Sequence, residues 1–277
     1  MRLPLILLAA GGICAAAGAA NAASVEVKDA VARVTVIPEN RPDVKVEFLT
    51  SNPSLPLEVR SFAGKTIVDG GLGRRIRNCH GRRDDIMVEV RGVGEIGYRD
   101  MPQVVIHTPR DVKVETGGAV FGSVGRSASL DLANGGCGDW TVANVEGHMR
   151  ISQAGSGDTH TGSAGDAKIR TAGSGDVATA DIHGSLDVDI AGSGDVTVAS
   201  VGGPVGVHVA GAGDVKIGNG HASTLDVAIA GSGDVDFGGV ADALKVRIMG
   251  SGDVRARQVR GPISKMVMGS GSVTTGG

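Results

Sequence analysis

The sequence predicts an all-β protein: a right-handed parallel β-helix, or β-solenoid, with coils of about 19 residues, preceded by a β-rich N-terminal cap. The main observation is a tetrapeptide, Gly-Ser-Gly-Asp or a near copy, that begins at Gly136, Gly155, Gly173, Gly192, Gly211, Gly231, Gly250 and Gly269. Successive copies start 18 to 20 residues apart, which is typical of stacked repeats. The aromatic content of 2% suits a narrow interior, and 46 glycines argue against helices, where each would cost about 1 kcal/mol.

Each repeat carries two short runs of alternating apolar residues, which predict two strands per coil. Counting the first glycine as position one, position five forms a mostly β-branched column: Trp140, Thr159, Val177, Val196, Val215, Val235, Val254 and Val273. A second column is expected on the opposite side of the coil: Leu186, Val205, Leu225, Leu244 and Ile263. One coil cannot bury these columns alone, so stability must come from stacking neighbouring coils about 4.8 Å apart.

Residues 1–23 predict a signal peptide that directs export and is then removed. Arg2 precedes an apolar run over residues 3–10, and Ala20-Asn21-Ala22 is a small-x-small cleavage signal. We therefore expect a signal peptide at 1–23, a β-rich cap region at 24–116 and the repeat solenoid at 117–277. The mature protein is expected in the periplasm, or outside the cell as a secreted or surface protein.

The segment 24–116 lacks the repeat and contains alternating runs at 25–27, 32–36, 44–48, 86–90 and 104–106, separated by prolines. A solenoid needs a cover over its first coil, because a terminal coil exposes apolar surface and unpaired strand edges. We interpret this segment as that cap.

Removal of the signal peptide would leave Cys79 and Cys137 as the mature cysteines. In an exported protein such a pair suggests a disulfide, and the alternative is two unlinked thiols. A bond would connect the cap region to the first clear repeat.

One aspartate per repeat predicts a row of carboxylates along one edge of the stack. Like charges at this spacing repel by roughly 0.9 kcal/mol per neighbouring pair even in water. One interpretation is calcium bound between coils by the candidate ligands Asp158, Asp176, Asp195, Asp214, Asp234 and Asp253. The alternative, which we favour, is that each carboxylate accepts backbone hydrogen bonds from its own turn or the next coil.

The composition excludes some function classes. A formal net charge of −3 provides no general attraction for nucleic acid. Carbohydrate-acting β-helices need aromatic platforms, and this chain has one Trp and one Tyr, with Trp140 expected in the core. We therefore expect a protein that is not an enzyme and needs no cofactor.

Two surfaces are candidate partner sites. A basic cluster formed by Arg74, Arg75, Arg77, Arg82 and Arg83 could bind an anionic glycan or a lipid headgroup, or could be a solvated loop. At the other end, residues 269–277 supply at most one strand and no polar cap, so the coil with Ile263 and Val267 is expected to present an open edge for self-association or a protein partner.

The signal peptide, the segments 34–38 (VTVIP), 43–46 (DVKV) and 104–109 (VVIHTP), and the coils that follow resemble the auto-transporter adhesins called head GIN domain proteins. The resemblance covers nearly the whole mature chain and implies a β-solenoid in an exported bacterial protein. Together with the residues, it predicts a non-catalytic structural or interaction module of the cell envelope with adhesin-like surface binding. The alternative is a calcium-stabilised or carbohydrate-acting β-helix protein.

Overall fold

The computed structural model describes residues 23–81 and 85–276. The predicted signal peptide lies outside the described residues except for Ala23, and Arg82 and Arg83 also lie outside them. The part of the chain that is described contains no helix long and apolar enough to cross a bilayer.

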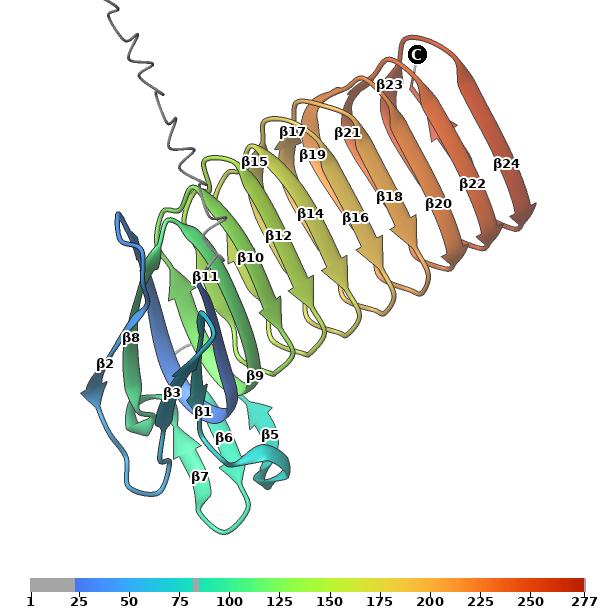
Figure 1. The fold of residues 1–277 in the computed structure, drawn as a ribbon. Coiled ribbons are helices and arrows are strands. Elements are labelled where there is room, and N and C mark those ends of the chain that lie inside the picture. Colours follow the sequence, from blue (N-terminus) through green and yellow to red (C-terminus); the bar gives the residue numbers. More distant parts are fainter. Residues whose placement is uncertain (1–22, 82–84, 277) are drawn as a thin grey trace, which may run out of the picture.

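The repeats form a β-solenoid in which every second strand pairs in parallel, as predicted (Figure 1). Sheet I contains β10 (Ser129–Asn134), β12 (His148–Gln153), β14 (Asp166–Thr171), β16 (Leu186–Ile190), β18 (Val205–Val209), β20 (Leu225–Gly231), β22 (Leu244–Gly250) and β24 (Ile263–Gly269). Sheet II contains β11 (Trp140–Val142), β13 (Thr159–Thr161), β15 (Val177–Ile182), β17 (Val196–Val201), β19 (Val215–Ala222), β21 (Val235–Ala241), β23 (Val254–Val259) and β25 (Val273–Thr275). In Figure 1 sheet I runs downward in front and sheet II returns upward behind while the stack advances to the right, so the coil is right-handed.

The two predicted apolar columns lie inside the coils. Position five is buried from Trp140 to Val254, and the opposite column is buried from Leu186 to Leu244. Alternate residues of each strand therefore face the narrow space between the sheets, and the residues between them face solvent. The glycine turns permit close stacking: a Cβ added at Gly192 would lie 2.3 Å from the carbonyl oxygen of Gly173 in the preceding coil.

The first strand of the chain, β1 (Ser24–Glu39), lies inside the stack rather than at its end. It pairs in parallel with β4 (Lys65–Asp69) and β8 (Gln103–Pro109) on one side and with β9 (Asp111–Val124) on the other. Both long strands bend at a corner, where Asp29 has φ 50° and Gly118 has φ 103°. Each of them therefore contributes to both sheets.

The predicted boundary between residues 116 and 117 falls within β9. The first half of β9 pairs with β10 in sheet I and the second half pairs with β11 in sheet II. A coil that spans both sheets therefore begins at Asp111, and the strand runs through the corner at Gly118 without interruption.

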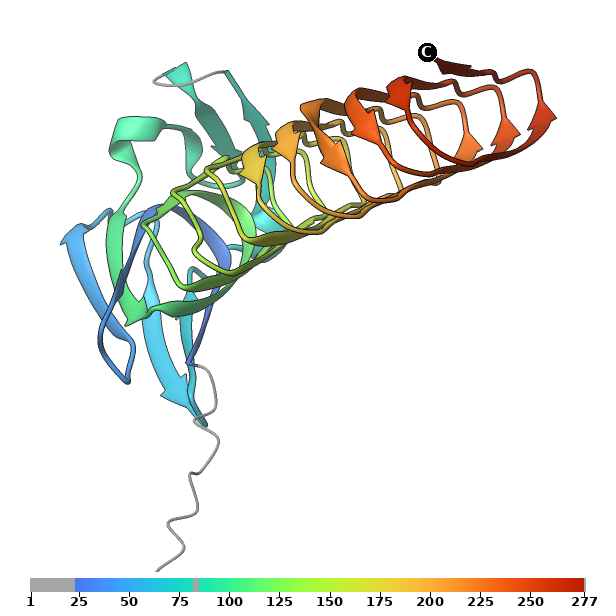
Figure 2. The same cartoon turned by 90° about the horizontal axis from the view of Figure 1, so that it is seen from above.

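Antiparallel strands close the N-terminal end of the stack. In sheet I, β3 (Glu58–Phe62) pairs with β4, and in sheet II, β2 (Lys45–Thr50) pairs with β8. A separate sheet of β5 (Ile76–His80), β6 (Met87–Val90) and β7 (Gly94–Gly97) lies beside the first coils (Figure 2), flanked by the short 3-10 helices η1 (Gly73–Arg75) and η3 (Tyr98–Asp100). This small sheet has its own apolar cluster against Phe121 of β9.

Candidate functional site

The repeat aspartates form a hydrogen-bonded row along one edge of the solenoid. Oδ1 of each aspartate accepts a hydrogen bond from the backbone N–H of the equivalent residue in the next coil, at 2.7–3.0 Å. The row begins at Asp139, ends at Ser272 and includes all the calcium candidates: Asp158, Asp176, Asp195, Asp214, Asp234 and Asp253. The structure thus shows the hydrogen-bonded arrangement that we favoured.

The two ends of this row differ in their electrostatics. Burial raises the pKa of Asp139, the first aspartate of the row, because the charged carboxylate loses solvation there. The pKa of Asp253, the last aspartate of the row, is lowered, first by the Ser272 hydroxyl and then by the Ser272 backbone N–H, which both donate to it at 2.9 Å.

Cys79 and Cys137 are joined by a disulfide, with their Cα atoms 6.2 Å apart. Cys79 lies in β5, and Cys137 occupies the serine position of the first tetrapeptide, Gly-Cys-Gly-Asp. The bond therefore attaches the small antiparallel sheet to the first repeat turn.

The described arginines of the basic cluster are exposed but not equivalent. Arg74 and Arg75 lie in η1, and Arg77 lies in β5. The Nε atom of Arg75 donates to the backbone carbonyl of Arg91 at 3.0 Å, so this side chain also holds the local loop structure.

The outer face of sheet I is charged along its middle coils. Asp187, Asp189 and His208 bring ligand atoms within 4.8 Å of one another, a spacing that a metal site could use. However, Lys168 forms an ion pair with Asp187, and Arg170 Nε lies 3.3 Å from Asp189 Oδ2. These cations already compensate the carboxylates, so the trio is accounted for as part of an ion-pair network.

Toward the C-terminal end the same face becomes apolar and uneven. At outward positions β18 and β20 carry small residues, including Ala228 and Ala230, beside His208 and Asp226, while β22 and β24 carry Met249, Met266 and Met268 beside Lys245 and Arg247. Each of these methionines is more than half exposed. We call the outer surface of β18, β20, β22 and β24 the methionine face.

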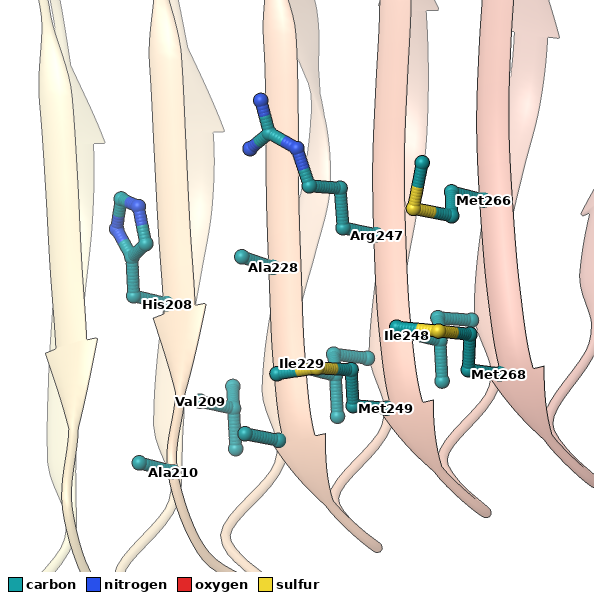
Figure 3. A pocket seen from close by; sticks show the side chains of 11 residues that line it. His208, Val209, Ala210, Ala228, Ile229, Arg247, Ile248, Met249, Met266 and Met268 are labelled. Atoms are coloured by element: carbon teal, nitrogen blue, oxygen red, sulfur yellow. The ribbon is translucent and has the colours of Figure 1, made fainter.

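A groove of about 340 Å³ lies in the methionine face. Figure 3 shows Met249 and Met268 in one row on β22 and β24, while His208 and Arg247 lie along one side of the groove. Arg247 Nη1 is 3.8 Å from Asp226 Oδ1 and Lys245 Nζ is 3.3 Å from Asp226 Oδ2. The groove therefore combines an apolar floor with a charged border, a composition typical of binding surfaces.

Our sequence interpretation did not identify the methionine face. A signal was present, because Met249, Met266 and Met268 alternate with the apolar core positions Ile248 and Val267 and must therefore point outward. The part of the groove lined by Ala210, Ala228 and Ala230 had no such signal, since alanine occurs throughout the chain.

Among the described residues, the edge of β24 is exposed: β24 pairs with β22 alone, and Ile263 and Val267 are 46% and 38% exposed. Lys265 is in register with Val246, which is buried, so a charged residue occupies a core register position of β24. An inward-pointing charge at a sheet edge is a known device against strand addition.

Comparisons with known proteins identify the family. A model described as "Putative auto-transporter adhesin, head GIN domain" matches residues 97–220 and 183–277. A crystal structure of a "Putative lipid binding protein" from Parabacteroides distasonis shares the fold, with 17% identity, a TM-score of 0.50 and 92% of each chain covered. A "putative adhesin" from Bacteroides fragilis aligns over 91% of each chain with 12% identity and a TM-score of 0.44. No curated protein matches the chain. Because the family model covers more than half of the chain, the protein belongs to the auto-transporter adhesin, head GIN domain family.

Proposed function

We propose that this protein is an exported, non-catalytic interaction module of the bacterial cell envelope and that the methionine face is its binding surface. The observation that carries this proposal is the exposure of three neighbouring methionines beside an apolar groove. Contiguous apolar surface of this kind costs solvation free energy in water and is typical of a surface that another molecule covers.

The side chains themselves suit binding. Methionine is unbranched and polarisable, so it adapts to the shape of a partner. The rigid parallel sheet beneath it holds the groove in place, because Val227, Val246 and Ile248 pack into the core on the other side of the same strands. The face therefore offers an adaptable surface on a fixed frame.

The carbohydrate-acting alternative receives no support from the aromatic residues. The ring of Trp140 is fully buried. Tyr98 packs edge-on against Phe121 with ring centroids 5.8 Å apart, and the guanidinium of Arg33 lies 5.1 Å from the tyrosine ring. Trp140 is therefore unavailable to a sugar, and Tyr98 is half-buried and already in contact with Phe121 and Arg33.

The proposal is tested by binding of the signal-free protein to intact cells and isolated envelope membranes of the bacterium that produces it, measured by co-sedimentation. Met249→Lys places a charge in the methionine face and is expected to reduce binding. Thr197→Lys, on the exposed outer surface of sheet II, is the matched control and is expected to bind like the wild type. Equal binding by both variants would contradict the assignment of this face.

The arginine cluster supports a secondary proposal, binding of an anionic headgroup or glycan. Arg74 and Arg77 are exposed. Co-sedimentation with phosphatidylglycerol vesicles, compared for the wild type and Arg74→Gln/Arg77→Gln, tests it. Salt-sensitive binding that the double variant loses is expected, and vesicle binding that is unchanged in the variant would reject it.

A further inference from the structure

The methionine face has a shape that can match a copy of itself. Its protruding part, on β22 and β24, lies directly beside its recessed part, on β18 and β20. A surface with a projection next to a hollow of similar extent is self-complementary under a two-fold rotation, which is the requirement for a closed dimer interface.

The charges of this face are also self-complementary under a two-fold rotation. Asp226 on β20 is in register with Lys245 on β22, and both side chains point outward. A negative group on the recessed side is therefore matched, at the same height along the strands, by a positive group on the protruding side.

We propose that two copies of this chain pack face to face through the methionine face, related by a two-fold axis that runs along the strands midway between β20 and β22. This inference rests on the proposed function and names the partner on the same surface: the molecule that the added protein meets on the producing cell is a second copy of this chain. The axis exchanges β20 with β22 and β18 with β24 and preserves the height of each residue. Met249 then lies over the partner's Ala230, and Lys245 lies over the partner's Asp226.

The remaining positions agree with this arrangement. Met268 would lie over the partner's Ala210, and Arg247 over the partner's Ala228, so these two long side chains meet small ones. Two flat sheets can stack in this way at about 10 Å with their strands aligned. Met266 would lie over the partner's His208, the one position in this row where two large side chains meet.

The open edge of β24 is a weaker candidate for self-association. Joining two solenoids end to end would bury Lys265 at a core position of the extended stack, where its charge has no partner. The side-by-side arrangement leaves Lys265 in solvent.

Sedimentation velocity of the signal-free protein over a range of concentrations is the first measurement, and we expect a reversible dimer. Asp226→Lys and Lys245→Asp should each weaken dimerisation by at least about tenfold, because like charges then face each other across the axis. An equimolar mixture of these two variants should form a heterodimer, since residues 226 and 245 of the two chains then face each other with opposite charges in both contacts. Native mass spectrometry identifies it by its mass.

The mixture is decisive because each variant also loses its intrachain Asp226–Lys245 ion pair. Mixing cannot restore that pair, so recovered association reports contacts between chains. A matched control is Lys216→Asp on the exposed outer surface of sheet II, which should leave the dimer unchanged.

A wild-type protein that stays monomeric, or a dimer indifferent to these substitutions, would overturn the inference. So would a mixture that forms no heterodimer. The proposed function fails separately: it is contradicted when Met249→Lys leaves envelope binding unchanged. A monomer whose envelope binding is lost in Met249→Lys would retain the function and reject only the second copy as the occupant.

Discussion

Asp214 is linked to Asp234 of the next coil by a hydrogen bond in which the Asp234 backbone N–H donates to Asp214 Oδ1 at 2.7 Å. The same relation recurs from coil to coil along the turn edge. These bonds satisfy a backbone donor at every turn and offset the repulsion between neighbouring carboxylates. The row of charges is therefore part of what holds the stack together.

Removing one member of the row should weaken the stack. We expect Asp214→Ala to lower the free energy of unfolding by about 1 kcal/mol, because it leaves the Asp234 N–H without its acceptor. Asp214→Asn should cost less, since an amide oxygen can accept the same bond and the charge repulsion with both neighbours, Asp195 and Asp234, disappears. Urea unfolding followed by circular dichroism compares the two variants, and an equal loss of stability in both would show that the negative charge itself is required.

Calcium should have little effect on the folded protein. The Oδ1 atoms of the candidate ligands, including Asp195 and Asp214, already accept backbone hydrogen bonds. We therefore expect the thermal midpoint to be the same in EDTA and in millimolar CaCl₂. A ligand that binds only the native state raises the midpoint, so a rise of several degrees that Asp195→Asn/Asp214→Asn abolishes would instead establish a metal site.

The end of the row predicts a pH effect. Because Ser272 donates to Asp253, the pKa of this carboxyl lies below its ordinary value of 3.8. The resulting stabilisation is present above pH 3.8 and is lost as the pH falls through the folded-state pKa. Ser272→Ala removes the hydroxyl donor and should raise the pKa of Asp253 in an NMR titration. An unchanged pKa would mean that the backbone N–H of residue 272 is sufficient.

The disulfide should contribute strongly to stability. Cys79 and Cys137 close a loop with a separation of 58 residues, for which the chain-entropy model gives about 4 kcal/mol. We expect reduction, or Cys79→Ser/Cys137→Ser, to lower the thermal midpoint. Hydrogen exchange should show faster exchange first in β5, β6 and β7, because the bond attaches this sheet to the solenoid. Uniform acceleration across the later coils would contradict a local attachment role.

Lys265 is expected to keep the exposed edge of β24 from pairing with other chains. Lys265→Val would complete an apolar surface with Ile263 and Val267 and should produce end-to-end oligomers or aggregates, detected by light scattering. Lys216→Val is the matched control, since Lys216 points outward from β19. Oligomers of the control but not of Lys265→Val would refute this role.

The repeating part of the fold follows from the sequence alone. A period near 19 and strict alternation of apolar residues are local signals, so they predicted parallel coils, the buried columns and the row from Asp158 to Asp253. Residues one period apart must become neighbours when identical units stack. The same reasoning predicted from the sequence that each aspartate carboxylate could accept a backbone hydrogen bond from the next coil.

Strand pairing outside the repeat is set by long-range contacts in the folded protein. The insertion of β1 between β8 and β9 joins segments that are distant in the sequence and share no period, so no local pattern encodes it. The methionine face likewise depends on the strand register, which sets Ala230 beside Met249. The role of Lys265 depends on β24 having a paired strand, β22, on one side only among the described residues. Such features arise from long-range packing, which single-strand alternation cannot specify.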